Sequence, residues 1–145
     1  MKYRIILVVL IAGLDALVQN ASADTSTTGK MNPIFQEVYP APHIAGGSLQ
    51  IVVEATQRNA VADGVLLAHG GNVAGYSLHV EQGIPVFEIT RKSEIFRVAW
   101  PQPVKGKMRI VADLGDKEMS LSVNGAPKVS AASPGLIRAE PRIGL

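Results

Sequence analysis

Four side chains that could bind a ligand fall together in the strands that the second half of the sequence predicts. They supply a hydroxyl, an imidazole, a carboxylate and a guanidinium: Ser77, His79, Glu88 and Arg97. Two tight turns set their positions, because a hairpin register must place apolar residues opposite one another on one face. Ser77, Glu88 and Arg97 then form one row across three neighbouring strands on the outward face, with His79 diagonal to Glu88.

This polar stripe has two interpretations. As a site, its donors and acceptors could bind a polysaccharide, and the four residues are the candidate ligand-binding residues. As a plain surface, it is solvated and holds a cross-strand Glu88–Arg97 pair that contributes only about 0.2–1 kcal/mol. No aromatic side chain is assigned to this face, because those nearby share the apolar register and are expected in the core: Tyr76, Phe87, Phe96 and Trp100.

The acidic residues elsewhere predict no reaction. Asp113, Asp116 and Glu118 surround a turn and could supply oxygen ligands to calcium, but a solvated hairpin loop is the favoured interpretation. A retaining glycosidase needs carboxylates that project together into a cleft, and no E-x-D-x-x-E pattern occurs. We therefore predict no metal site and no catalytic carboxylate pair.

The remaining residue types with catalytic potential are also sparse. His43, His69 and His79 lack metal-ligand spacing. No G-x-S-x-G motif supports a Ser-His-Asp arrangement, although its members need not be adjacent in sequence. The chain has no cysteine, which excludes disulfides and thiol chemistry. We predict a protein that is not an enzyme, with no catalytic residue and no cofactor.

A glycine cluster interrupts the segment GVLLAHGGNVAGYSLHV at Gly70, Gly71 and Gly75. Phosphate-binding loops need a strand, a glycine turn and then a helix whose N-terminus faces the anion. Here a second strand pattern follows the glycines. The cluster therefore predicts a strand-to-strand connection that needs positive φ and close backbone approach.

The elements that must position these residues are short strands. From residue 48 onward the apolar period is two, which is typical of half-buried strands. Loops are expected at 82–83, 92–93, 114–117 and 124–126. The resulting registers pair Leu78 with Phe87, Ile89 with Phe96, Ala112 with Met119 and Leu121 with Val129. Six or more such strands with no convincing helix predict an all-β fold, an antiparallel β-sandwich.

The first 23 residues have the features of a secretory signal peptide. Lys2 and Arg4 precede the apolar run 5–14, and an Ala-Ser-Ala signature ends at Ala23. The run is too short to span a membrane. Cleavage after Ala23 predicts an exported protein, periplasmic or secreted, with no membrane span left. An uncleaved anchor is the alternative, because Asp15 interrupts the apolar segment.

Behind the signal peptide the sequence predicts one folded domain. Residues 24–47 are expected to form a flexible leader and a lead-in rich in proline and glycine, with a short edge strand near 35–39. Residues 48–145 form the expected β-sandwich domain. The net charge is +2, and no basic run or basic patch with interleaved aromatics occurs, so nucleic acid is not a predicted partner.

The stretch GVLLAHGGNVAGYSLHVEQGIPVFEI resembles the start of the C-terminal β-sandwich accessory region of bacterial arylsulfatases. An apolar strand, a Gly-Gly loop, a Gly-Tyr-Ser-Leu strand and a glycine turn follow in the same order. The later segments GKMRIVADL, MSLSVNGAPKV and PRIGL are similar to strands and turns of concanavalin A-like and laminin G-like sandwiches. The resemblance covers residues 48–145 and implies a concanavalin A-like jelly roll that lacks its closing strands.

The resemblance also implies a non-catalytic accessory role, because sulfatase chemistry needs a C/S-x-P-x-R motif that this sequence does not contain. One expected function is an exported binding or interaction module for a polysaccharide or an exported protein partner. The alternative is a detached accessory domain that docks or stabilises a hydrolase without a ligand of its own. Missing closing strands would leave an open edge, which predicts self-association or partner addition at 141–145.

Overall fold

The computed structural model describes residues 2–12, 15–18, 44–57, 61, 63–71 and 73–139. Its strands are β1 (Lys2–Ala12), β2 (Asp15–Val18), β3 (Ile44–Ala45), β4 (Ser48–Gln57), β5 (Gly64–Gly70), β6 (Ala74–Glu81), β7 (Ile84–Arg91), β8 (Glu94–Ala99), β9 (Gly106–Leu114), β10 (Glu118–Val123), β11 (Val129–Ala132) and β12 (Arg138–Ala139). One sheet has the order β11-β10-β9-β4-β1-β2, a second has the order β5-β6-β7-β8, and β12 pairs with β3. The described residues contain no helix.

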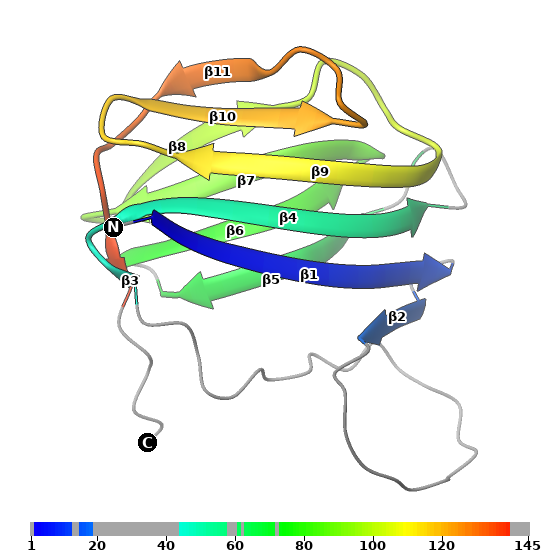
Figure 1. Ribbon diagram of the computed structural model, residues 1–145, viewed down its shortest axis with the longest axis horizontal. Coiled ribbons are helices and arrows are strands. Elements are labelled where there is room, and N and C mark those ends of the chain that lie inside the picture. The colour runs from blue at the N-terminus through cyan, green and yellow to red at the C-terminus, as the bar shows by residue number, and fades with distance from the viewer. Residues whose placement is uncertain are drawn as a thin grey trace, which may run out of the picture.

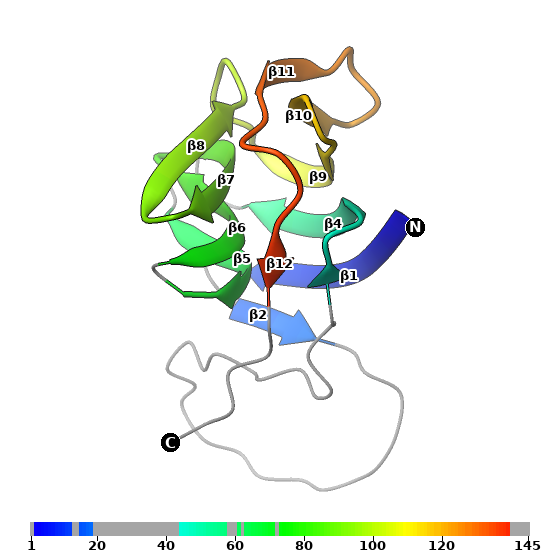
Figure 2. The same ribbon diagram turned by 90° about the vertical axis from the view of Figure 1, so that its left-hand side faces the viewer.

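Two four-stranded antiparallel sheets, β4 with β9 to β11 and β5 to β8, stack face to face (Figure 1). Figure 2 shows them as two layers. The predicted all-β class and antiparallel β-sandwich are therefore confirmed. The core between the layers includes the fully buried side chains of Leu49, Ile51, Val53, Leu78, Phe87, Ile89, Ile110, Leu114, Met119 and Leu121.

The period of two in the sequence explains which side chains reach this core. Along β4, Ile51 and Val53 are buried in the core while Glu54 is exposed. Side chains alternate between the faces of a strand, so each sheet directs one apolar face towards the other. Of the four aromatic residues predicted in the core, Tyr76 and Phe87 are buried within it, whereas Phe96 and Trp100 are partly buried and pack against it.

The two hairpins β6–β7 and β7–β8 have the predicted registers. Leu78 lies opposite Phe87, and Ile89 lies opposite Phe96. A two-residue hairpin turn of type I′ requires positive φ at both central residues. The four turn residues meet this requirement: Gln82 (φ 48°), Gly83 (φ 81°), Lys92 (φ 51°) and Ser93 (φ 65°). These local turns align the outward residues of three strands.

The register between β9 and β10 differs from the prediction by two residues. The sequence pattern predicts Ala112 opposite Met119, whereas the structure pairs Leu114 with Met119 and Ala112 with Leu121. β9 continues through Leu114, and the chain reverses at residues 115–117. A shift of two residues keeps every side chain on its own face. The requirement that apolar residues share a face therefore cannot distinguish the two registers, and the observed strands are separated by three residues rather than the predicted four.

The register between β10 and β11 is as predicted, with Leu121 opposite Val129. Asn124 and Gly125 between these strands have φ of 53° and 74°. The Asn124 side-chain oxygen also accepts a hydrogen bond from the backbone N–H of Arg109 at 2.8 Å. This contact ties the turn to the neighbouring strand β9.

The N-terminal strands lie at the edge of the larger sheet. β1 runs parallel to β4 and pairs with it from Ser48 to Glu54. β1 and β2 fall within residues 1–23, whose cleavage and export remain predictions. The predicted strand near 35–39 and the predicted association segment 141–145 lie outside the described residues. Within the described part of the chain, no helix has the length and apolarity that a membrane crossing needs.

Candidate functional site

The outer face of the β5–β8 sheet carries the candidate binding residues. Ser77 of β6 lies opposite Glu88 of β7, which lies opposite Arg97 of β8, so the predicted row is present. His79 follows two positions after Ser77 and shares its face. The intervening Leu78 is fully buried in the core, which places the row on the side away from the other sheet.

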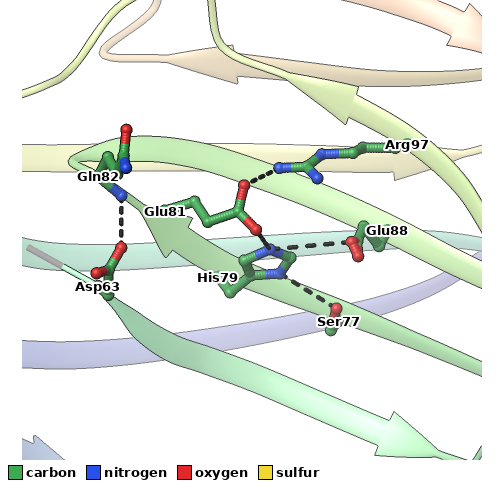
Figure 3. A network of polar contacts seen from close by, with 7 residues as sticks. All are labelled: Asp63, Ser77, His79, Glu81, Gln82, Glu88 and Arg97. Carbon is green, nitrogen blue, oxygen red and sulfur yellow. Dashed lines mark hydrogen bonds and ion pairs between the residues drawn. The ribbon is translucent and has the colours of Figure 1, made fainter.

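The side chains on this face meet in a network of polar contacts (Figure 3). The Ser77 hydroxyl oxygen lies 3.3 Å from Nδ1 of His79. Nε2 of His79 lies 3.9 Å from a carboxylate oxygen of Glu81 and 3.9 Å from one of Glu88. The other carboxylate oxygen of Glu81 accepts a hydrogen bond from the Arg97 guanidinium. Three adjacent strands thus bring together a hydroxyl, an imidazole, two carboxylates and a guanidinium.

The ion pair of Arg97 is made with Glu81 rather than with its register neighbour Glu88, which corrects the pairing considered from the sequence. The Glu81–Arg97 contact spans β7, which lies between the strands that carry the two residues. The sequence interpretation does not include Glu81 in the site. The signal for it was available, because Ser77, His79 and Glu81 alternate along β6 and therefore share a face.

The network is partly open to solvent. The side chains of His79 and Glu88 are 15% and 21% exposed, whereas those of Glu81 and Arg97 are 53% and 43% exposed. Restricted side chains lose less freedom when they bind, so His79 and Glu88 form the preorganised part of the network. Glu81 and Arg97 can exchange their mutual contact for a ligand, because an exposed ion pair holds its partners only weakly.

The order Ser77, His79, Glu88 is that of a nucleophile, a base and an orienting carboxylate. The distances are long for that chemistry, at 3.3 Å and 3.9 Å, because nucleophile activation uses hydrogen bonds of about 2.6–3.2 Å. The three residues also lie on the outer face of a sheet. The same three groups can form reversible hydrogen bonds with a ligand.

The glycine cluster forms the turn between β5 and β6, as predicted. Gly70 has φ +95°, and the N–H of Gly71 donates to the carbonyl oxygen of Ala74 at 2.9 Å. A Cβ on Gly70 would lie 2.4 Å from that oxygen, and one on Gly75 would lie 2.7 Å from the carbonyl oxygen of His69. Only glycine is compatible with these two close contacts to backbone carbonyl oxygens. A strand follows directly, so the cluster does not lead into the helix N-terminus that a phosphate loop requires.

A half-buried histidine and a buried tyrosine lie next to this turn. His69 and Tyr76 are paired across β5 and β6, with edge-to-face rings whose centroids are 5.5 Å apart. Burial lowers the pKa of His69 and raises the pKa of Tyr76. Both ring nitrogens of His69 and the Tyr76 hydroxyl are buried without a hydrogen-bond partner among the described residues. The pair lies apart from the outer network, and His43 lies outside the described residues.

Two of the three acidic residues considered for calcium have separate partners. Asp113 accepts a hydrogen bond from the Gln50 amide at 2.8 Å. Glu118 pairs with Lys128, and this contact lowers the pKa of the Glu118 carboxyl. Asp116 is exposed. No group of three or more histidine, cysteine or acidic side chains placed to hold a metal occurs within the described ranges. These contacts favour the interpretation of the region as a solvated loop.

Comparison with known proteins adds no family assignment to this geometry. No family model matches the chain, and no curated protein matches it either. The resemblance to arylsulfatase accessory regions therefore remains a prediction from sequence motifs. The β-sandwich and the polar network on its outer face are the features from which a function can be argued.

Proposed function

We propose that this protein is an exported, non-catalytic binding module of the concanavalin A-like kind, and that the outer face of β6, β7 and β8 binds a polysaccharide. The observation that carries the proposal is the network of Ser77, His79, Glu81, Glu88 and Arg97. Such a network offers donors and acceptors at fixed positions on a sheet, and sugar hydroxyl groups need both. The sequence resemblance supports the accessory role.

The charges of the network favour a particular class of polysaccharide. Glu81 and Glu88 supply two carboxylates, and among the described residues Arg97 supplies the one guanidinium paired with this network. A sulfate group approaching Arg97 would meet both carboxylates, and like charges at short range repel. We therefore propose a neutral, hydroxyl-rich polysaccharide as the ligand. Sulfated polysaccharides are expected to bind less well.

A glycan array that contains both neutral and sulfated polysaccharides tests this proposal. The native protein is expected to bind neutral chains and to bind sulfated chains less well. His79→Ala removes the imidazole that joins the two carboxylates, and Arg97→Ala removes the guanidinium. Each variant is expected to lose about tenfold in affinity, which corresponds to about 1.4 kcal/mol.

Arg109→Ala is the matched control for Arg97→Ala. Arg109 lies on β9 in the other sheet, is 52% exposed and pairs with Glu54 at 3.8 Å. Its removal deletes a similar ion pair without touching the proposed site, so glycan binding is expected to stay unchanged. The proposal fails if the native protein binds no glycan, or if folded His79→Ala and Arg97→Ala bind as the native protein does.

Export is a separate part of the proposal and has its own test. The intact mass of the protein recovered outside the cytoplasm is expected to correspond to a chain that begins at Asp24. A recovered mass that includes residues 1–23 contradicts cleavage after Ala23. That result would leave the glycan experiment fully interpretable, because the network lies on β6 to β8.

A further inference from the structure

Strand β4 has two different neighbours in the larger sheet. On one side it pairs antiparallel with β9 from Leu49 to Gln57. On the other side it pairs parallel with β1 from Ser48 to Glu54 (Figure 1). Both ladders are regular. β1 lies wholly within residues 1–23, so predicted cleavage after Ala23 would remove it and turn β4 into an edge strand.

The newly exposed edge would lack the features that usually protect edges. Natural edge strands are short, bulged, or carry lysine or proline. β11 is four residues long, and β5 has a register shift between Val65 and Leu67. β4 is ten residues long with the sequence SLQIVVEATQ, without lysine or proline. Its single charged side chain, Glu54, is paired with Arg109 on the outer face.

The sequence of β4 is complementary to itself in one antiparallel register. With Val52 at a two-fold axis, every pair joins residues of the same character. The core-facing pairs are Ile51 with Val53 and Leu49 with Ala55, and the outward pairs are Gln50 with Glu54 and Ser48 with Thr56. Moving the axis to Ile51 or Val53 would place Val52 opposite Gln50 or Glu54. All three axes keep each side chain on its own face, but only the Val52 axis places Val52 opposite an apolar residue, so we take that register as the preferred one.

Val52 itself supports an interaction at this position. It is 3% exposed although it alternates with the core residues Ile51 and Val53 and lies outside the core cluster. Loss of β1 would remove a neighbouring strand from beside this apolar side chain. A second Val52 placed opposite would restore apolar contact, because directly opposed residues in an antiparallel pair have Cβ atoms about 4.5–5.5 Å apart.

We propose that, after removal of residues 1–23, β4 is a strand-acceptor edge whose occupant is β4 of a second copy of this chain. The two larger sheets then join through antiparallel β4–β4 pairing into one eight-stranded sheet. Before cleavage, β1 occupies this edge and blocks β4–β4 pairing. The inference rests on the predicted cleavage and is independent of polysaccharide binding, because the edge and the polar network lie on different sheets.

The experiment compares the processed and unprocessed forms of the full-length gene product. The processed chain is purified after export and its N-terminus is verified by mass. The unprocessed chain is made by cell-free synthesis without membranes. Size-exclusion chromatography with light scattering is expected to show a dimer for the processed chain and a monomer for the unprocessed chain.

Val52→Lys and Val111→Lys form a matched pair of variants. Val111 lies opposite Val52 on β9 and shares its face, but it lies inside the sheet rather than at the edge. Val52→Lys would oppose two ammonium groups at the axis, and we expect loss of the dimer. Val111→Lys is expected to remain dimeric. Circular dichroism verifies that each variant is folded.

A cross-linking experiment keeps the proposal testable if Val52→Lys fails to fold. The chain has no cysteine, so Val52→Cys introduces a single thiol. A short bis-maleimide is expected to link processed Val52→Cys into a covalent dimer and to leave Val111→Cys monomeric. The proposal is overturned if export leaves residues 1–23 in place or the processed chain is monomeric. It is also overturned by a dimer that persists in Val52→Lys, which would point to another edge such as 141–145.

Discussion

Side-chain contacts on the inner and outer faces of the β5–β8 sheet are determined by different factors. On the inner face, Leu78 lies opposite Phe87 and both are fully buried in the core. On the outer face, Glu88 lies opposite Arg97, yet Arg97 pairs with Glu81 across an intervening strand. A buried apolar side chain packs against its neighbours, whereas a long solvated side chain can reach past one. Register therefore decides packing on the inner face but not ion pairing on the outer face.

Substitution of adjacent residues on the two faces should give the largest contrast. Phe87→Ala leaves a cavity in the core and is expected to lower the free energy of unfolding by about 3–5 kcal/mol. Glu88→Ala, one residue later, removes only a 3.9 Å contact to His79 and is expected to cost less than about 1 kcal/mol. Urea denaturation measures both values. Equal losses would mean that the outer face is packed as tightly as the inner one.

The Tyr76 hydroxyl is an exception on the inner face, since it is buried without a hydrogen-bond partner among the described residues. A buried unsatisfied polar group costs about 1–3 kcal/mol. Tyr76→Phe removes the group and keeps the ring, so it is expected to raise the free energy of unfolding by about 1 kcal/mol. A decrease in the same denaturation experiment would show that the hydroxyl is hydrogen-bonded in solution.

His69 gives the inner face a pH dependence. Burial holds its pKa below the usual value of 6.5 in the folded chain, so the unfolded chain binds the proton first as the pH falls. Stability is therefore complete above about pH 6.5 and decreases as the pH drops towards the folded pKa. Denaturation of the native chain and of His69→Phe between pH 8 and pH 5 measures this difference. Parallel pH profiles would contradict it.

The smallest effect is expected at the ion pair on the outer face. Both partners of the Glu81–Arg97 pair are about half exposed, and such pairs contribute about 0.2–1 kcal/mol. A double-mutant cycle with Glu81→Ala and Arg97→Ala should give a coupling energy in this range that declines with added salt. A coupling above 2 kcal/mol would show that the pair is structural and is not free to exchange with a ligand.

The hairpins show how far the sequence could predict the candidate site. Two-residue turns at 82–83 and 92–93 link strands of alternating pattern, so the row of Ser77, Glu88 and Arg97 follows from local information. Glu81 also lies in that pattern, but its partner lies two strands away. The role of Glu81 depends on which carboxylate within reach the flexible Arg97 guanidinium contacts. Sequence spacing does not determine that choice.

The β9–β10 hairpin marks the limit for the fold. Its predicted register pairs Ala112 with Met119, and the observed one pairs Leu114 with Met119. Both registers bury the same apolar side chains, because a shift of two residues preserves the face. The choice between them depends on the backbone hydrogen bonds of the complete ladder, in which Leu114 also lies opposite Leu49 of β4.

The sequence by itself determined the strand class, the inner and outer faces, the glycine turn and the hairpins of β6 to β8. These features depend on side-chain alternation and on φ at a few turn residues, both of which are local. Only the tertiary structure decided that β4 lies between β9 and β1, that Gln50 contacts Asp113, and that Arg97 contacts Glu81. Those choices depend on backbone and side-chain geometry between segments that are distant in sequence, and no local pattern records that geometry.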